Sequence, residues 1–211
     1  MKYLSLCLAT NGVAEWVFPV LDNIFKQDAD IREWEIVVTD NGNNKAFGEK
    51  MQMYASEHSN LIYKKTDAFM FENQIEALKL ASGEYLKFIN HRSMLQANAI
   101  KWMIDVIKSN IAEKPVIYWS NGALHHDKQM TYIDFDGFVK GLKEFASWTT
   151  GVGVWKSDFE KIPEDWKYNK ISPHSDVLFR ERHKTKYIID DSFWCQDIDS
   201  SHAAKGKYDL Y

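Results

Sequence analysis

Residues 73–89 read NQIEALKLASGEYLKFI and carry the clearest fold signal in the chain. Apolar residues recur at helical spacing from Asn73 to Ala81, which predicts a helix with one buried face. Ser82-Gly83 then interrupts the pattern, and Leu86 to Ile89 has the short apolar character of a buried strand. A helix that runs directly into such a strand is typical of the βαβ units of α/β proteins.

The same alternation of strands and helices continues on both sides of this segment. It predicts right-handed βαβ units and a mostly parallel sheet up to about residue 120. After Ser120 the pattern loosens, and the stretch to Phe138 is expected to form irregular strands and loops. Pro19 is expected to kink the first helix or to mark its start. The expected strands are Leu4–Ala9, Glu35–Thr39, Val116–Trp119 and Lys186–Ile189, and the other expected helices are Ala14–Lys26, Ile100–Ile111 and Ser175–Arg182.

The composition fits a globular protein of 211 residues, with 45% hydrophobic and 27% charged residues. The net charge of -4, with interspersed signs, provides no basic face, which excludes a nucleic-acid polymer as a partner. No apolar run approaches the ~20 residues that span a bilayer. Cys7 and Cys195 have neither framework nor metal-site spacing, so free thiols in a reducing compartment are expected.

Polar residues follow three of the expected strands. They are Thr10-Asn11, Asp40-Asn41-Gly42 and Asn90-His91-Arg92. In an open parallel sheet, ligands bind in the crevice beyond the carboxyl ends of the strands, so these three groups are expected to converge on one pocket. For Asp40-Asn41-Gly42 a plain turn at the end of a strand is the alternative, because these residue types favour turns.

These features, in this order, resemble the family 2 glycosyltransferases of the GT-A fold. The most specific part is Asn73…Ala77…Ala81-Ser82-Gly83-Glu84-Tyr85, which is close to the family's N.A...A.GEY pattern. The resemblance implies an α/β fold with three α/β/α layers around a mostly parallel, mixed central sheet. It also implies one domain over residues 1–211, with a nucleotide-sugar-binding half at 1–120 and an acceptor-side half at 121–211. The end of that second half, near Gly206, resembles a junction after which related enzymes continue.

The resemblance also implies which residues contact the substrates. The first loop and the aspartate after the second strand would hold the base and ribose of a sugar nucleotide, since a carboxylate accepts hydrogen bonds from both. On the acceptor side, Gly151 and Gly153 match a glycine-containing segment, and Trp148 beside them could stack on a sugar, with core packing as its alternative role. The implied donor nucleotide-binding residues are Thr10, Asn11, Asp40, Asn41, Asn73, Asn90 and His91.

At residues 90–92 the chain departs from this family. The family has two or three aspartates there, which hold Mg²⁺ or Mn²⁺ against the donor diphosphate, whereas this chain has Asn90-His91-Arg92. Asn90 and His91 are weak ligands for hard cations, so no metal, or a weakly bound one, is expected. Arg92 is a catalytic candidate, because a guanidinium can neutralise the diphosphate in place of a metal. A solvated loop and an inactive relative are the alternatives.

Asp176 is the second catalytic candidate, as the base that takes the proton from the acceptor hydroxyl. The run Pro173-His174-Ser175-Asp176-Val177-Leu178-Phe179-Arg180 resembles the family's ED..L..R helix start. Capping of that helix is the alternative role. Asp190-Asp191 could supply a carboxylate that residues 90–92 lack, but a turn is favoured, and His125-His126-Asp127 is expected to be an exposed loop.

The resemblance implies a hexosyl/glycosyltransferase that moves a sugar, with inversion, from a nucleoside-diphosphate sugar to a glycan or lipid-linked glycan acceptor. The chain is most similar to short bacterial enzymes that build surface polysaccharides such as capsule and O-antigen, which implies a cytoplasmic protein, at the inner face of the membrane or in peripheral contact with it. Two other functions stay open, a catalytically silent GT-A-like binding module in a larger assembly and a nucleotidyltransferase. The lack of a basic residue in Thr10-Asn11-Gly12-Val13-Ala14 argues against the nucleotidyltransferase.

Overall fold

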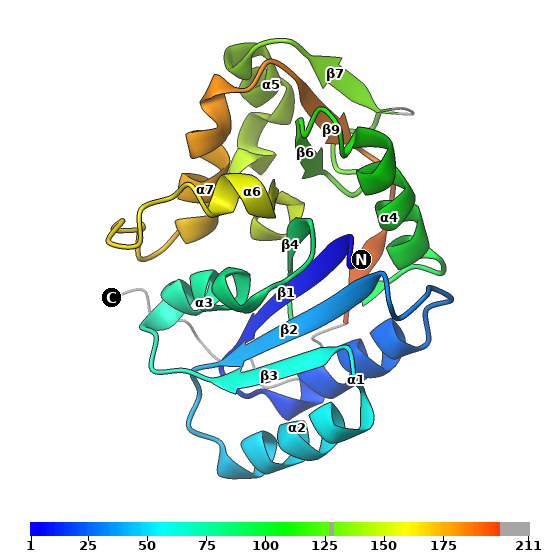
Figure 1. Cartoon of the computed structure of the whole chain (residues 1–211), viewed down its shortest axis with the longest axis vertical. Coiled ribbons are helices and arrows are strands. Elements are labelled where there is room, and N and C mark those ends of the chain that lie inside the picture. The colour runs from blue at the N-terminus through cyan, green and yellow to red at the C-terminus, as the bar shows by residue number, and fades with distance from the viewer. Residues whose placement is uncertain (127–128, 199–211) are drawn as a thin grey trace.

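The computed structural model describes residues 1–126 and 129–198. The central sheet contains β1 (Leu4–Thr10), β2 (Trp34–Asp40), β3 (Leu61–Lys65), β4 (Tyr85–Ile89) and β8 (Gly153–Trp155). Its strand order is β3-β2-β1-β4-β8, with the first four strands parallel and β8 antiparallel to β4 (Figure 1). The predicted α/β fold with a mostly parallel, mixed sheet is confirmed.

Helices cover both faces of this sheet. One face carries α1 (Ala14–Phe25), α2 (Lys45–Glu57) and α4 (Ala99–Asn110), and the other carries α3 (Asn73–Leu80) and α7 (Pro173–Arg180). The helix α5 (Phe135–Leu142) packs against strands of a smaller sheet. Side chains alternate between the faces of a strand, so Leu6 and Leu8 of β1 join the first core and Cys7 joins the second. The result is the expected α/β/α arrangement of layers (Figure 1).

The remaining strands form two smaller sheets. β6 (Val116–Trp119), β9 (Tyr187–Asp190) and β7 (Met130–Tyr132) associate in the order β6-β9-β7, and β5 (Ser93–Leu95) pairs with β10 (Cys195–Asp197). The second pairing brings the last described residues beside the segment that follows β4. The short helices are α6 (Lys156–Phe159) and the 3₁₀ segments η1 (Met70–Glu72), η2 (Lys143–Ser147), η3 (Thr149–Gly151) and η4 (Glu181–His183).

The turn from α3 into β4 accounts for the Ser82-Gly83 signal in the sequence. A Cβ on Gly83 would lie 2.7 Å from Ser5 Oγ and 2.9 Å from the Leu4 backbone, so only glycine fits. The Gly83 N–H donates to Ser5 Oγ at 2.8 Å instead. The buried Glu35 accepts hydrogen bonds from Ser82 N at 2.5 Å and Ser82 Oγ at 2.8 Å. These contacts fix the turn against β1 and β2.

Some elements differ from the sequence prediction. α2 and β3 were not predicted, because only Phe47 and Met51 of α2 are buried and β3 ends in exposed lysines, so neither segment has a strong apolar period. The pattern predicts irregular strands and loops up to Phe138, which agrees with the short strand β7, whereas the start of α5 at Phe135 was not predicted. Pro19 lies inside α1, which begins at Ala14, so it does not mark the start of that helix. The expected junction near Gly206 lies outside the described residues.

Candidate functional site

A cavity of about 530 Å³ opens at the carboxyl ends of β1, β2 and β4. Its floor includes Cys7 and Ala9 of β1 and Phe88 of β4. Its walls come from the residues just beyond these strands, from the loop 67–71 and from Thr149. This is the edge of a parallel sheet where ligands bind in other α/β proteins.

The structure brings most of the residues predicted for the nucleotide to this one cavity. Among the residues that line it, six were predicted from the sequence. They are Thr10, Asn11, Asn41, Asn73, Asn90 and His91. The convergence of the strand ends is therefore as predicted, while the contact of these side chains with a nucleotide stays a prediction.

Asp40 is the exception, and its predicted contact with the nucleoside needs correction. Its side chain is fully buried, and the described residues that line the cavity do not include it. One carboxylate oxygen accepts a hydrogen bond from Gly42 N at 2.7 Å, and the other accepts one from Tyr63 Oη at 3.1 Å and lies 3.7 Å from Lys65 Nζ. Both oxygens are therefore used to fix the turn after β2, which is the alternative role that the sequence left open.

Asn73, the first residue of the N.A...A.GEY match, connects three strand ends. It is 2% exposed, and its Nδ2 donates to Thr10 O at 3.1 Å and to Thr39 O at 2.9 Å. Its Oδ1 accepts a hydrogen bond from Thr66 Oγ1 at 2.7 Å. The three hydrogen bonds that these two amide atoms make within the described residues go to β1, to β2 and to the loop after β3. Asn73 therefore sets the spacing of the cavity walls.

Asn41 holds the wall formed by the loop 67–71. Its Nδ2 donates to Ala68 O at 2.9 Å and to Met70 O at 3.0 Å. Met70 has a φ of 47°, a left-handed conformation that costs energy for a residue with a side chain. The two hydrogen bonds from Asn41 offset part of that cost and keep the exposed Phe69 and Met70 at the cavity rim.

His91 is held in the wall as a neutral imidazole. Its Nδ1 lies 3.1 Å from Thr10 Oγ1, which also accepts a hydrogen bond from Gly12 N at 3.1 Å. Its ring centroid lies 5.0 Å from that of Trp16. Burial, assisted by the nearby Arg92 guanidinium, lowers the pKa of His91 to about 4. The ring is therefore uncharged at pH 7 and adds no charge to the cavity.

Arg92 lies behind this wall rather than in it. Its guanidinium carbon is 5.2 Å from the centroid of the Trp16 ring, a cation–π contact, and the described residues that line the cavity do not include Arg92. The buried Arg92 Nε has no hydrogen-bond partner among the described residues. Such a donor is costly to leave unpaired. The predicted contact of Arg92 with a diphosphate requires its side chain to turn from Trp16 toward the cavity.

The residues after β4 do not fit a divalent metal. The Asn90 side chain offers one amide oxygen, which already accepts a hydrogen bond from Arg92 N at 3.0 Å. His91 offers a nitrogen ligand beside a guanidinium, whereas Mg²⁺ and Mn²⁺ prefer several oxygen ligands with negative charge. Within residues 1–126 and 129–198, no group of three or more His, Cys, Asp or Glu side chains could hold a metal ion.

Asp176 does not line the cavity, and its role as the catalytic base stays a prediction. It lies in the first turn of α7, and its Oδ2 accepts a hydrogen bond from Asn169 N at 2.5 Å. The described residues that line the cavity do not include Asp176. The carboxylate ties the loop before α7 to the first turn of that helix, which is close to the capping role that the sequence left open.

The predicted acceptor-side residues belong to the core. A Cβ on Gly151 would lie 2.2 Å from Tyr118 Cζ, and one on Gly153 would lie 2.5 Å from Tyr85 Cε1. Both glycines are buried, so the close approach that requires them is that of two core tyrosines and not that of a sugar. Trp148 is partly buried and packs against the first core cluster. The two tyrosines explain both glycines, and the contact of Gly151, Gly153 and Trp148 with an acceptor stays a prediction.

The other polar clusters behave as the sequence predicts. Asp190 and Asp191 accept hydrogen bonds within the surrounding loops, including one from His126 N to Asp191 Oδ2 at 2.8 Å. Asp190 ends β9 and Asp191 begins the loop after it, and neither is among the described residues that line the cavity. His125 and His126 are exposed, as expected, and Asp127 lies outside the described residues.

Three polar residues of the cavity wall were not predicted from the sequence. They are Asp67 in the loop after β3, Gln74 in the first turn of α3, and Thr149 at the start of η3. Gln74 directly follows Asn73, so the same motif could have led to it. Asp67 and Thr149 are single polar residues in loops without a motif, and only the fold brings them to the strand ends.

Lys87 is a charged residue that the strand pattern hid. It lies in the middle of β4, is fully buried, and donates from Nζ to Phe88 O at 2.9 Å and to Thr150 O. The ammonium also lies 4.7 Å from the centroid of the Trp194 ring. Burial lowers the pKa of Lys87 to about 7, which places its titration near neutral pH.

Replacement of Lys87 by Met is expected to change how stability depends on pH. Between pH 7 and pH 10.5 the unfolded chain binds a proton at Lys87 that the folded chain has lost. The free energy of unfolding of the parent should therefore rise with pH, relative to that of Lys87→Met, by up to about 1 kcal/mol per pH unit. Urea unfolding of both proteins at pH 6, 8 and 9.5 measures this difference, and a constant difference would show that Lys87 titrates normally.

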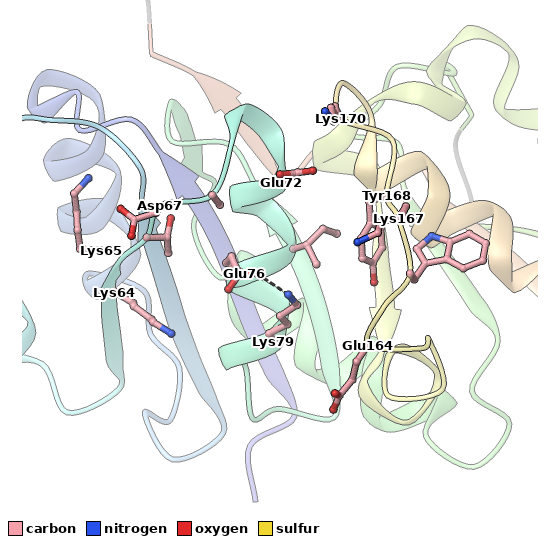
Figure 2. A pocket seen from close by; sticks show the side chains of 14 residues that line it. Lys64, Lys65, Asp67, Glu72, Glu76, Lys79, Glu164, Lys167, Tyr168 and Lys170 are labelled. Carbon is pink, nitrogen blue, oxygen red and sulfur yellow. Dashed lines mark hydrogen bonds and ion pairs between the residues drawn. The ribbon is translucent and has the colours of Figure 1, made fainter.

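A second cavity, of about 560 Å³, lies along α3 between the end of β3 and the loop 164–170 (Figure 2). Lysines and carboxylates alternate on its walls, and Glu76 pairs with Lys79 at 2.7 Å. The nearly balanced charges give no preference for an anion or a cation. Asp67 and Ala68 line both cavities. Only the first cavity collects the ends of β1, β2 and β4, so we take it as the candidate ligand site.

Comparisons with known proteins identify the fold. No known family model and no curated protein matches this sequence. Among solved structures, the chain is similar to residues 1–349 of TarS from S. aureus, with a TM-score of 0.70, 13% identity, and coverage of 95% of this chain and 61% of that chain. The fold is GT-A-like.

Two further structures of the same TarS fragment contain ligands. The complex with UDP-GlcNAc has a TM-score of 0.69 and 14% identity, and covers 92% of this chain and 58% of that chain. The complex with UDP has a TM-score of 0.68 and 15% identity, and covers 92% and 60%. This chain thus spans less than two thirds of the length of these TarS structures. At such low sequence identities the similarity establishes the fold alone. The activity has to be inferred from the residues of the candidate site.

Proposed function

We propose that this chain is a glycosyltransferase that binds a nucleoside-diphosphate sugar in the cavity at the strand ends. The observation that carries the proposal is the convergence of Thr10, Asn41, Asn73 and Asn90 on one cavity at the carboxyl edge of a GT-A-like sheet. The cavity volume of about 530 Å³ lies within the usual range for small-molecule sites. The TarS structures with UDP-GlcNAc and UDP show that a protein of this fold binds such donors.

The shape of the cavity suggests how the donor lies. The cavity reaches from the loop after β3 to the segment after β4, which are three strand spacings, or about 14 Å, apart. The nucleoside would lie toward Asn41 and the loop 67–71, where Phe69 and Phe71 provide apolar surface and Asp67 provides a carboxylate. The diphosphate and the sugar would then lie toward Asn90 and Thr149 on the β4 side.

The chemistry would be the displacement of the nucleoside diphosphate by an acceptor hydroxyl. The hydroxyl oxygen forms a bond to the anomeric carbon and its proton passes to solvent, while the bond from that carbon to the diphosphate oxygen breaks and its electron pair leaves with the diphosphate. We propose that Arg92 neutralises this developing charge, because the residues after β4 suit no metal and Arg92 Nε is unpaired among the described residues. A hexose as the transferred sugar, inversion, and a growing surface glycan such as capsule or O-antigen as the acceptor rest on the sequence resemblance.

The site of action is also part of the proposal. We propose a cytoplasmic protein at the inner face of the membrane, as the sequence resemblance implies. None of the helices in the described residues combines the length and the apolar character that crossing a bilayer requires. A peripheral contact with the membrane would therefore use the protein surface and not a spanning helix of the described residues.

A catalytically silent binding module is the second candidate function. The absence of carboxylates at residues 90–92 favours it, because the family resemblance places the metal there. Such a protein would bind the nucleotide, or a partner subunit of a larger assembly, without transferring sugar. Separate measurements of nucleotide binding and of sugar transfer therefore distinguish the two functions.

Filling the cavity floor tests the proposed location of the donor. Ala9 lines the cavity from β1, and Ala9→Leu should reduce UDP-GlcNAc affinity at least tenfold because the larger side chain occupies the space of the ligand. Calorimetric titration measures this loss. Ala97→Leu, at an exposed position before α4, is the matched control and should bind as the parent does. Equal affinity of Ala9→Leu and the parent would place the donor elsewhere.

A further inference from the structure

His174 joins two residues of the cavity wall from behind. It lies at the start of α7, is 4% exposed, and is not among the described residues that line the cavity. Its Nδ1 lies 3.1 Å from Thr149 Oγ1 and 3.3 Å from Gln74 Oε1. Its Nε2 lies 2.8 Å from Ser147 O and 3.3 Å from Thr149 Oγ1, so Ser147 O is the nearer partner of Nε2 and Nδ1 is the nearer partner of Thr149. One imidazole thus connects α7 with α3 and with the segment that precedes β8.

These partners determine which nitrogen of His174 carries the proton. The Ser147 carbonyl can only accept, so Nε2 carries the hydrogen and donates it. Burial lowers the pKa of His174, so the ring is neutral at pH 7 and Nδ1 is an acceptor. The Thr149 hydroxyl therefore donates to Nδ1. The Gln74 amide can bond to the same nitrogen with its N–H end once the amide is turned over.

The orientation of the Thr149 hydroxyl has a consequence for the cavity. With its hydrogen engaged by His174, the Thr149 oxygen can offer the cavity lone pairs but no hydrogen. The backbone at this point is also fixed, because the buried Lys87 donates to Thr150 O. Thr149 is thus a preorganised acceptor whose side chain and backbone are both held by buried groups.

We propose that Thr149 accepts a hydrogen bond from the transferred sugar and that His174 is the positioning residue that makes it an acceptor. This inference rests on the proposed function, because it assigns the sugar end of the donor cavity. Thr149 lines the cavity from η3, which contacts β4, so it lies on the β4 side where the sugar end of the donor is placed. A sugar hydroxyl or amide N–H is the donor that such an oxygen recognises, and a nucleoside diphosphate without a sugar lacks it.

The test compares the affinity for UDP-GlcNAc with that for UDP, or for GDP-mannose with that for GDP if the parent prefers guanine nucleotides. Thr149→Val keeps the shape and removes the oxygen, so the sugar nucleotide should bind at least fivefold more weakly while UDP binds within twofold of the parent. Thr131→Val, at an exposed position in β7, is the matched control and should change neither affinity.

Two substitutions of His174 separate positioning from packing. His174→Asn places an amide oxygen near the position of Nδ1 and should keep most of the preference for the sugar nucleotide. His174→Gln places an amide N–H near the position of Nε2, keeps the bond to Ser147, and should lose that preference as Thr149→Val does. A purely structural role would instead lower the melting temperature and weaken both ligands equally in the two variants.

The outcomes distinguish this inference from the proposed function. If the parent binds UDP-GlcNAc and the ratio of the two affinities is unchanged in Thr149→Val and in His174→Gln, the inference is wrong and the proposed function stands. If the parent binds no nucleotide and no sugar nucleotide, the proposed function is wrong and the inference fails with it. Selective loss of the sugar nucleotide in Thr149→Val and His174→Gln, with retention in His174→Asn, supports both.

Discussion

Asn73→Ala is expected to lose about 3 kcal/mol of folding stability and all measurable affinity for nucleotides. The substitution removes three hydrogen bonds, and Thr10 O, Thr39 O and Thr66 Oγ1 each lose a buried partner. Each such loss typically costs about 1 kcal/mol or more. Because the same amide sets the distances between the ends of β1, β2 and the loop after β3, the cavity should lose its shape even in molecules that remain folded.

Urea unfolding followed by tryptophan fluorescence measures the stability of this variant, and calorimetry measures its affinity. Asn41→Ala is the matched control, because Asn41 is the same residue type at the same cavity but its two bonds hold a single loop. We expect Asn41→Ala to lose about 1 kcal/mol or less while nucleotide affinity falls. If Asn73→Ala were no less stable than Asn41→Ala, the role of Asn73 in connecting the strands would have to be abandoned.

Arg92→Ala is expected to reduce sugar transfer at least a hundredfold, and EDTA is expected to leave the parent unaffected. A guanidinium that stabilises charge on the departing diphosphate contributes mainly in the transition state, so kcat should fall more than the affinity for the donor. The assay measures transfer from UDP-GlcNAc, and separately its hydrolysis, with and without EDTA. The melting temperature of the variant checks that loss of the contact with Trp16 has not unfolded the protein.

Two controls sharpen the result for Arg92. Arg92→Lys keeps the charge but loses the paired donor geometry, so it should retain part of the activity. Arg32→Ala removes a guanidinium whose side chain is 84% exposed and pairs with Asp30, and it should have no effect. Strong inhibition of the parent by EDTA, or full activity of Arg92→Ala, would contradict the replacement of a metal by Arg92.

The fold was predictable because local patterns and overall topology agree along most of this chain. The segment 73–89 contains a helix, a turn that only glycine allows, and a buried strand, and each has a distinct sequence signature. The amphipathic α4 and the apolar β6 were equally clear. In contrast, α2 buries few residues and β3 ends at the surface, so their patterns are too weak to predict from sequence.

The position of the cavity was also predictable, but the direction of individual side chains was not. Strand ends place Thr10, Asn41 and Asn90 at one edge because the parallel pairing of strands fixes where they finish. Whether a carboxylate there faces a ligand depends on competing partners. Asp40 bonds to Gly42 N, as the turn-forming sequence Asp40-Asn41-Gly42 allows, and to Tyr63 Oη, a contact that has no sequence signature.

The surroundings of the predicted acceptor-side residues were not predictable for a related reason. The glycine-containing segment at 150–153 matches a family pattern, but in this chain tyrosine rings from β4 and β6 pack against those glycines. Asp176 bonds to the loop in front of its own helix, while His174, two residues earlier, points toward the cavity wall. A shift of two residues on a helix changes the face completely, and a sequence motif does not define which face is inward.

Calorimetric titration of UDP, GDP, CDP and dTDP, each in EDTA and in Mn²⁺, tests the central claim most directly. We predict that one of these nucleotides binds in EDTA, that Mn²⁺ leaves its affinity unchanged, and that Ala9→Leu weakens the binding at least tenfold. Binding of that kind would support a donor site at the strand ends that needs no metal. The absence of binding by all four nucleotides, or binding that requires Mn²⁺, would contradict it.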